Sequence, residues 1–333
     1  MSSCAVSVIV AAYNVAPYIE QCLDSLVTQA VDQIEILAID DGSTDNTLTK
    51  LKLYQARFPA KVRVITQSNQ GLSVVRNVGL AEASCKYVGF VDGDDWVSRD
   101  MYLELFTGLE QHEADVAIGN GVMVDHTTGH TRPFADRGTW VRLKAGRGQM
   151  FDPARNPDVF MLDTSACRRL YRAEFLRQQR FRFAEGFLFE DVPAHFELLC
   201  KTNRLVLIDR PFYYYRVGHP GRITDRTDRQ ILQIIEVMAR VVTALQTYEA
   251  EPELWANFIW FQDWVLRWLG SQVEKRFARD FARGACSVAA KFPASGIQIF
   301  QDKFCSDQLS QAGVKLQVLG REDAYIDFIR SHV

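Results

Sequence analysis

The stretch "IEILAIDDGSTDNT" (residues 34–47) decides the fold class. A mainly apolar run of seven residues ends in two carboxylates, Asp40 and Asp41, and a turn rich in helix-capping residues follows. A run of this kind indicates a buried strand, and the turn indicates that a helix starts directly after it. The stretch therefore predicts one strand-to-helix step of a parallel sheet, with acidic side chains where the strand ends.

The same alternation covers the first hundred residues. Strands are predicted at 6–12, 34–40, 61–66 and 86–92, and helices at 17–29, after the turn at 42–47, and at 71–83. Strands that alternate with helices build βαβ units. The fold class is therefore α/β, with a mostly parallel, Rossmann-like sheet flanked by helices.

The rest of the chain is less regular. A helix is predicted at 101–111, a strand at 114–120, and a loop at 125–160, where Gly, Pro, Arg and Asp are frequent. Apolar residues at helical spacing dominate after residue 226. We predict a domain over 1–225, with halves 1–100 and 101–225, and a mainly helical C-terminal region over 226–333.

Bulk composition excludes several classes of protein. The 333 residues are 47% hydrophobic with a net charge of −3, which argues against bulk binding to nucleic acid. The first residues lack a basic leader and read as a strand, and no apolar run is long enough to cross a bilayer. Seven scattered cysteines without close pairs argue against disulfides and a zinc cluster, and predict a cytoplasmic protein.

A second acidic cluster lies in "VGFVDGDDWV" (residues 88–97). Three carboxylates within four residues repel each other and are costly to bury without partners. They follow a predicted strand, as Asp40 and Asp41 do, and ligands of α/β sheets collect at the carboxyl ends of strands. Turns and helix caps also use Asp, but two acidic strand ends together favour a site for a positive ligand.

Five segments resemble the family 2 glycosyltransferases, which have the GT-A fold. They are "VSVIVAAYNVAPYIEQCLDSL", "EILAIDDGSTDNT", "NQGLSVVRNVGLAEA", "YVGFVDGDDWV" and "RRLYRAEFLRQQRFRFAEGFLFEDVPAHFEL", within residues 5–225. The resemblance implies an inverting enzyme that moves a sugar from a UDP-sugar to a hydroxyl. The implied acceptor is a saccharide or lipid-linked saccharide in bacterial-type surface polysaccharide synthesis.

The resemblance assigns the donor site to the first half of the domain. Tyr13 would stack on the nucleotide base, and Asp41 would accept a hydrogen bond from the uracil N3–H. Arg76 would reach the base or the diphosphate.

The resemblance also implies a divalent cation, Mn²⁺ or Mg²⁺, beside the diphosphate. Asp94 would be a ligand, and Asp92 would hold the ribose or a water on the cation. Asp95 would support Asp94 or act as a ligand itself. Such cations prefer oxygen ligands and need only one or two protein carboxylates when a substrate supplies phosphate.

The acceptor side is assigned to later motifs. Asp191 would be the general base, with Glu190 beside it to contact the acceptor; the alternative is that the pair only begins a helix. Arg216, His219 and Arg222 lie in a motif that would close over the diphosphate, with His219 as a metal ligand or as an ordinary loop histidine.

Two other functions are compatible with clustered aspartates. A phosphotransferase of the haloacid dehalogenase type also has aspartates at a strand end, but its DxDx[TV] motif is not matched by "DGDDW". A catalytically inactive, transferase-like scaffold is the other alternative, and it is disfavoured because Asp41, Asp94 and Asp191 are all present.

The C-terminal region carries a basic amphipathic helix predicted at 273–291. Lys275, Arg279 and Arg283 recur every four residues, beside a helix rich in tryptophan. This pattern predicts peripheral contact with the inner face of a membrane. The alternative is that the apolar faces pack on the transferase domain or form a homodimer, with the tryptophans in the core.

Overall fold

A computed structural model describes residues 4–31, 33–219 and 228–331. The chain forms two compact units. The first unit consists of Met1–Asp152, Asp163–Gly186 and Lys201–His219, and the second of Pro153–Leu162, Phe187–Cys200 and Pro220–Val333. This division differs from the predicted boundary at residue 226, because two short segments of the sheet-containing half pack with the C-terminal helices.

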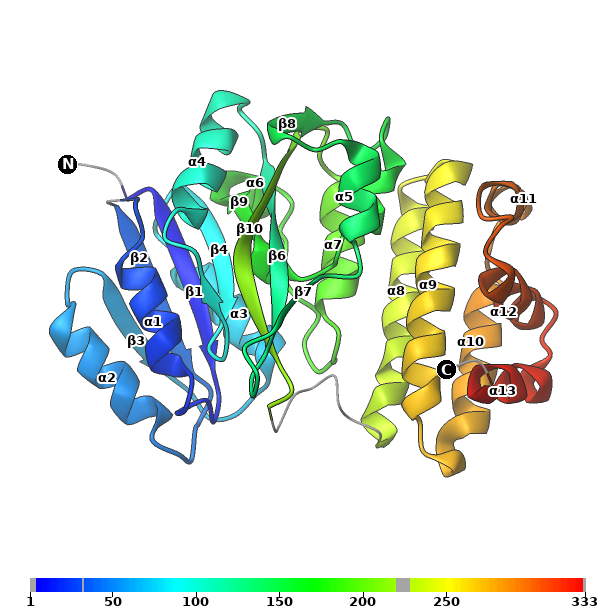
Figure 1. The fold of residues 1–333 in the computed structure, drawn as a ribbon, viewed down its shortest axis with the longest axis horizontal. Helices are drawn as coiled ribbons and strands as arrows, with labels where there is room; N and C mark the ends of the chain where they lie inside the picture. The colour runs from blue at the N-terminus through cyan, green and yellow to red at the C-terminus, as the bar shows by residue number, and fades with distance from the viewer. Residues whose placement is uncertain (1–3, 32, 220–227, 332–333) are drawn as a thin grey trace. The chain divides into compact units, whose positions relative to one another are not determined.

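The start of the first unit follows the predicted alternation closely. Its elements are β1 (Val6–Ala12), α1 (Ile19–Val27), β2 (Ile34–Asp40), α2 (Thr47–Arg57), β3 (Val62–Thr66), α3 (Leu72–Glu82) and β4 (Tyr87–Asp92). β1 pairs in parallel with both β2 and β4. α1 and α2 cover one face of these strands and α3 covers the other (Figure 1), as right-handed crossovers require when the strand order reverses.

The sheet continues beyond β4 with both strand directions. The added elements include β5 (Trp96–Val97), α4 (Met101–Gln111), β6 (Val116–Asp125), η2 (Ala166–Arg168), β9 (Arg169–Arg172), α6 (Ala173–Gln178) and β10 (Leu205–Val217). β9 is antiparallel to β4 and to β6, and β10 is parallel to β6. The strands β1, β2, β4, β6 and β10 therefore run in one direction, and their carboxyl ends share one edge of the sheet.

The predicted loop at 125–160 is wrong. The segment contains β7 (Thr131–Pro133), α5 (Arg137–Leu143), β8 (Arg147–Phe151) and η1 (Pro157–Met161). β7 pairs with β6, and β8 pairs with β10, whose paired residues lie 54 to 61 positions further along the chain. Elements this short have no periodicity of their own, so tertiary pairing determines them.

The second unit is helical, as predicted for the C-terminal region. It contains η1, α7 (Asp191–Cys200), η4 (Arg229–Leu232), α8 (Gln233–Thr247), α9 (Pro252–Gln272), η5 (Lys275–Phe277), α10 (Ala278–Ala289), α11 (Ala294–Lys303), α12 (Gln308–Val318) and α13 (Glu322–Ser331). α8 and α9 lie side by side (Figure 1). Phe196 of α7 packs its ring against Phe160, Phe258 and Phe261, which explains why α7 and η1 belong to this unit.

The predicted basic helix at 273–291 is shorter than expected. It begins at Ala278, and Lys275 lies in the preceding 3₁₀ turn. Phe281 is fully buried, as the predicted apolar face requires. Arg279 forms an ion pair with Asp323, and Arg283 with Asp280 and Glu322, so acidic side chains offset the positive charge of this face.

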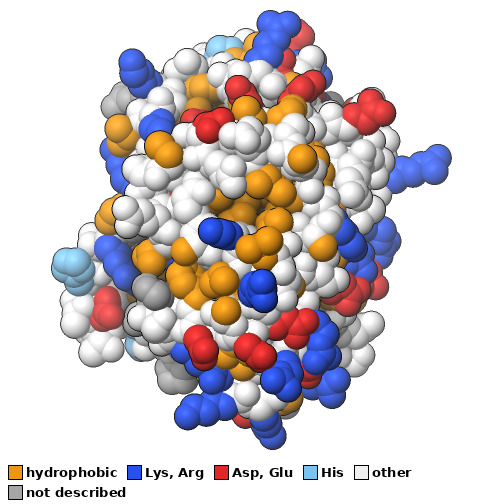
Figure 2. Space-filling view, turned by 90° about the vertical axis from the view of Figure 1, so that its right-hand side faces the viewer, with side chains coloured by type: hydrophobic (Ala, Val, Ile, Leu, Met, Phe, Trp, Pro, Cys, Tyr) orange, Lys and Arg blue, Asp and Glu red, His pale blue; other side chains and the backbone are white. Residues whose placement is uncertain are grey.

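The tryptophans of α9 divide between core and surface. Trp255 is buried, whereas Trp264 and Trp268 are more than a third exposed and stack on each other with their ring centroids 6.2 Å apart. Figure 2, which views the right-hand side of Figure 1, shows a group of hydrophobic side chains with basic side chains among them. No helix in the described part of the chain is long and apolar enough to cross a membrane.

The prediction that the chain contains no disulfide is wrong. Cys4 and Cys85 are joined, with their Cα atoms 4.7 Å apart. The bond links residues that flank β1 and β4, two strands that neighbour each other in the sheet but lie 81 residues apart in sequence. Sequence spacing does not reveal such a pairing, because the sheet brings the two cysteines together.

Candidate active site at the carboxyl edge of the sheet

The turn after β2 braces the loop that carries Tyr13. The side chain of Asn14 accepts hydrogen bonds from the backbone N–H and the hydroxyl of Thr44, and Ser43 Oγ accepts from the Asn14 N–H. Thr47 Oγ1 accepts from the backbone N–H of Val15. These capping-type residues therefore fix the end of β1, and Tyr13 extends from it with 48% of its surface exposed.

Asp41 anchors a second loop. Its Oδ1 accepts from Gln67 Nε2 at 2.7 Å and from the Gln70 N–H at 2.9 Å, and its Oδ2 accepts from the Gly71 N–H at 2.8 Å. A carboxylate has about four acceptor positions, so one position on Oδ2 remains for a ligand. Gly71 has a φ of 92° and directly precedes α3. Asp41, which is buried, thus holds the backbone of the loop at 67–71 that leads into α3.

Arg76 and Asp92 lie together at the end of β4. The Arg76 Nη2 atom is 3.1 Å from Asp92 Oδ1, and the guanidinium lies over the ring of Phe183. The arginine side chain is almost fully buried, while that of Asp92 is 30% exposed. The buried Arg76 guanidinium therefore stabilises the charge of Asp92, one of the three clustered carboxylates at the carboxyl edge.

Asp94 is contacted by two residues from the end of β10. The Nε2 atom of His219 is 3.2 Å from Asp94 Oδ2, and Arg216 Nε donates to the Asp94 backbone carbonyl at 2.7 Å. His219 is 6% exposed, so its ring is fixed beside the carboxylate. The structure therefore brings together a carboxylate and an imidazole that the sequence placed 125 residues apart.

Asp95 points into the protein. Tyr213 Oη donates to its Oδ2 at 2.6 Å, and the Arg216 N–H donates to its Oδ1 at 2.7 Å. Burial, and then the charges of Asp94 and Asp92, raise the pKa of Asp95 well above its usual range. Both oxygens hold β10 in place, which favours a supporting role for Asp95 over the predicted role of a ligand.

The turn between Asp92 and Asp94 requires glycine. A Cβ atom at Gly93 would lie 2.9 Å from the backbone oxygen of Ala11 and 3.1 Å from side chains of Ile19 and Val15. The Gly93 N–H donates to the same Ala11 oxygen at 2.8 Å. Close approach of β1 therefore determines this residue and fixes where Asp94 emerges.

The donor atoms present suit a divalent cation that also binds substrate. Within the described ranges, no group of three or more His, Cys, Asp or Glu side chains could hold a metal. Asp94 and His219 supply one carboxylate oxygen and one imidazole nitrogen at the same point. Mg²⁺ and Mn²⁺ sites with few protein ligands are completed by water and substrate phosphates, so this pair fits a cation bound with a diphosphate.

Glu190 and Asp191 belong to the second unit. Asp191 is the first residue of α7, and Glu190, just before it, is 4% exposed. Phe189 has a φ of 63°, and the Leu188 N–H donates to Gln233 Oε1 at 2.9 Å, so the approach to the pair is held by α8. Their predicted roles stay predictions. Arg222 lies outside the described residues.

Sequence reasoning missed two residues of this edge, Tyr18 and His126. The strand predicted to end at residue 120 continues to Asp125, so His126 directly follows the carboxyl end of β6. Its ring lies 6.3 Å from that of His219, and Tyr18 lies against both imidazoles. A correct boundary for β6 would have pointed to His126, because residues that follow such strands tend to line the ligand site.

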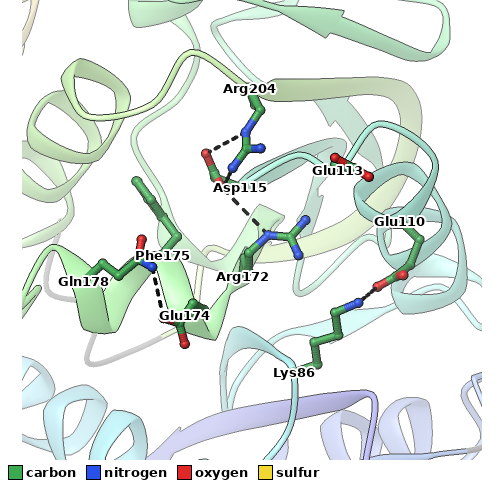
Figure 3. A pocket seen from close by; sticks show the side chains of 9 residues that line it. All are labelled: Lys86, Glu110, Glu113, Asp115, Arg172, Glu174, Phe175, Gln178 and Arg204. Carbon is green, nitrogen blue, oxygen red and sulfur yellow. Dashed lines mark hydrogen bonds and ion pairs between the residues drawn. The ribbon is translucent and has the colours of Figure 1, made fainter.

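A cavity of about 350 Å³ lies at the opposite edge of the sheet (Figure 3). Asp115, near its centre, is held by Arg204 at 2.8 Å and faces Arg172 at 3.7 Å, while Lys86 bonds to Glu110. This edge carries the amino ends of β4, β6 and β10. Its basic groups are used in ion pairs between elements, so the cavity is a structural charge network, distant from the strand ends that carry the candidate site.

Comparison with known proteins identifies the family. A family model described as glycosyl transferase family 2 matches residues 7–179, just over half of the chain. The chain therefore belongs to glycosyl transferase family 2, as the five motifs predicted. This assignment replaces the haloacid dehalogenase interpretation.

Curated relatives carry glycosyltransferase names. The uncharacterized glycosyltransferase EpsJ of Bacillus subtilis is 35% identical over 227 residues, which are 66% of this chain and 63% of that protein. Glycosyltransferase GlyA of Streptococcus pneumoniae is 29% identical over 243 residues, 72% of this chain and 34% of that protein. The match thus spans less than two thirds of either relative's length.

Solved structures confirm the GT-A fold. Residues 1–349 of Staphylococcus aureus TarS, crystallised with UDP, match with a TM-score of 0.75 at 19% identity, over 98% of this chain and 91% of that one. A mannosyltransferase from Pyrobaculum calidifontis in complex with GDP-Man and Mn²⁺ matches with a TM-score of 0.54 at 16% identity, over 98% of this chain and 86% of that one.

Proposed function

We propose that the protein transfers a sugar from a UDP-sugar to a hydroxyl group of a saccharide or lipid-linked saccharide, with inversion and with Mn²⁺ or Mg²⁺. The observation that carries the proposal is the Asp94–His219 pair at the edge where parallel strands end. TarS, whose name describes a poly(ribitol-phosphate) β-N-acetylglucosaminyltransferase, supports the choice of a UDP-sugar, because its fold was solved with UDP and with UDP-GlcNAc.

In this proposal the first unit holds the donor. Tyr13 stacks on the base, Asp41 accepts from the base N–H with the remaining position on Oδ2, and Arg76 keeps Asp92 beside the ribose or diphosphate. Asp94 and His219 would hold the cation, which when bound neutralises charge on the departing diphosphate. Arg216 fixes Asp94 from its backbone side.

Asp191, the first residue of α7, is the general base in this proposal. Asp191 accepts the proton of the acceptor hydroxyl while that oxygen forms a bond to the anomeric carbon, and Glu190 contacts the acceptor. The bond from the anomeric carbon to the phosphate oxygen breaks, and its electron pair leaves with the nucleoside diphosphate. A single displacement from the opposite side inverts the anomeric centre.

A donor panel tests the proposal. UDP-, GDP- and dTDP-sugars are incubated with the protein and Mn²⁺, and release of the nucleoside diphosphate is followed. We expect release from a UDP-sugar well above that from the other nucleotides, and loss of this preference in Asp41→Asn. Equal release from all donors would contradict the uracil contact, and UDP binding without turnover on any acceptor would support the inactive scaffold.

Contact with the inner face of a membrane, and a homodimer through the C-terminal helices, remain part of the proposal. Ion pairs with α13 reduce the charge that Arg279 and Arg283 could offer to anionic lipid. Co-sedimentation with anionic vesicles at low salt tests the membrane contact, with Lys275, Arg279 and Arg283 changed together to Glu as the comparison. Loss of concentration-dependent association on truncation near residue 226 would favour the dimer.

A further inference from the structure

Tyr18 lies at the centre of the residues that contact Asp94. It is the N-cap residue of α1, and its ring centroid lies 5.0 Å from that of His219 and 5.3 Å from that of His126. The Arg216 guanidinium carbon lies 4.9 Å from the same ring centroid. The Tyr18 ring therefore contacts both Arg216 and His219, the two residues at the carboxyl end of β10 that hold Asp94.

These contacts restrict the two residues strongly. Arg216 lies against Tyr18 and also against Trp96, whose ring stacks on Tyr214 at an interplanar angle of 1°. Arg216 Nη2 further donates to Gln21 Oε1 at 2.6 Å, one helical turn beyond Tyr18. A guanidinium over an aromatic face is attracted to it, so α1 holds the end of β10 through two side chains.

His219 depends on Tyr18 in a similar way. Its Nε2 faces Asp94 only in one range of ring orientations, and the rings of Tyr18 and His126 limit rotation from two directions. Residues that orient a metal-binding histidine commonly alter metal affinity about 10- to 100-fold when they are replaced. The Tyr18 ring, without any contact to the cation, can therefore set how well the pair binds it.

We propose that Tyr18 is a positioning residue for the divalent-cation site, acting through His219 and Arg216 on Asp94. This inference rests on the proposed function, because it takes Asp94 and His219 as the cation's ligands. Tyr18 follows Tyr13 by five residues, so in this proposal the segment that leads into α1 contributes both the side chain that stacks on the nucleotide base and the side chain that orients the cation site. The ring carries this role; no hydrogen bond to the Tyr18 hydroxyl is found within the described residues.

The test measures Mn²⁺ affinity at saturating UDP, by the electron paramagnetic resonance signal of free Mn²⁺, for four proteins besides the wild type. Tyr18→Leu should bind Mn²⁺ at least about tenfold more weakly, and Tyr18→Phe within about twofold of wild type. His126→Ala removes an exposed ring and should weaken binding about threefold. Leu53→Ala, an exposed apolar side chain of α2, is the matched control and should bind as wild type.

A second titration separates positioning from direct contact. UDP affinity at saturating Mn²⁺ should be unchanged in Tyr18→Leu, since the ring does not touch the nucleotide in this proposal. Loss of UDP affinity there, or wild-type Mn²⁺ affinity in Tyr18→Leu, would overturn the inference. If Tyr18→Leu does not fold, Tyr18→Met is measured in its place, and wild-type Mn²⁺ affinity in that variant would overturn the inference. Absence of Mn²⁺ binding in the wild type would overturn the proposed cation site itself.

Discussion

The two edges of the sheet in the first unit both carry clustered charges, but they are built differently. At the amino edge, the buried carboxylate of Asp115 is held by Arg204 and faces Arg172. At the carboxyl edge, the donors that the buried carboxylate of Asp95 receives from the described residues are neutral: the Tyr213 hydroxyl and a backbone N–H. The first arrangement pairs a buried carboxylate with cations, whereas the second raises the pKa of Asp95 through burial and then the charges of Asp94 and Asp92.

The carboxyl edge therefore disfavours additional negative charge in the absence of a cation. Burial, and then the charges of Asp94 and Asp92, raise the pKa of Asp95. Burial, and then the charges of all three aspartates, with Asp95 first, raise the pKa of the Cys22 thiol. Functional sites commonly retain such groups at a cost in stability. A cavity alone does not identify a site here, since the cavity of Figure 3 lies at the edge whose charges are paired.

The largest expected effect is loss of activity on changing Asp94. We expect Asp94→Asn to reduce sugar transfer more than about a thousandfold, because the negative charge of the proposed cation ligand is removed. EDTA should abolish wild-type activity, and added Mn²⁺ or Mg²⁺ should restore it. Full activity of the wild type in EDTA would contradict the proposal that the carboxyl edge binds a cation required for transfer.

The next effect concerns the predicted base in the second unit. Asp191→Asn keeps the size of the side chain but cannot accept the acceptor's proton, so transfer should fall by about 10²- to 10⁴-fold. UDP affinity, measured by calorimetry, should stay within about twofold of wild type, because Asp191 does not contact the donor in the proposed function. A loss of less than about tenfold would place the base elsewhere, first at Glu190.

The matched change at the amino edge should act on stability alone. Asp115→Asn weakens the bonds to Arg204 and Thr202 and should lower the free energy of unfolding by about 2 kcal/mol. Its transfer activity should remain within about twofold of wild type. The free energy of unfolding is measured by chemical denaturation in EDTA for both variants. Asp94→Asn should be no less stable than wild type. A loss of stability in Asp94→Asn equal to that in Asp115→Asn would contradict the comparison.

The smallest expected effect is a pH dependence of stability caused by Asp263 of α9. This buried acid forms an ion pair with Arg267 at 2.7 Å, as Asp115 does with Arg204, and belongs to neither edge of the sheet. Burial raises the pKa of Asp263 to about 6 despite this partner. Because the folded-state pKa is above that of the unfolded chain, folding is favoured by protonation and this contribution to stability falls as pH rises toward 6. Between pH 7 and pH 5 the wild type should gain about 1 kcal/mol relative to Asp263→Asn. Parallel pH profiles of unfolding would contradict this assignment.

The sequence predicted the first hundred residues of the fold because their signals are local. Each strand from β1 to β4 is an apolar run followed by capping residues, and the acids at 40–41 and 92–95 mark strand ends directly. The first unit's later elements depend on partners far along the chain, as β8 does on β10. Periodicity within 125–160 could not reveal them.

The candidate site was predicted unevenly for the same reason. The roles of Asp94, Arg76 and His219 were all predicted through the family resemblance and stay predictions, while the structure shows His219 beside Asp94. Tyr18 and the Cys4–Cys85 bond required knowing which elements are neighbours in space. Asp95 belongs to the motif, yet its inward orientation depends on Tyr213 of β10, which no local pattern shows.

The most direct test of the central claim is calorimetric titration of UDP with and without Mn²⁺, on wild type and on Asp94→Asn. A cation bound at Asp94 offsets the negative charge of the clustered aspartates, which otherwise repels the diphosphate. UDP binding by the wild type should therefore be at least about tenfold tighter with Mn²⁺ than in EDTA. Asp94→Asn should show no such difference, while Asp115→Asn should retain it. Equal UDP affinity of the wild type with Mn²⁺ and in EDTA would contradict the account.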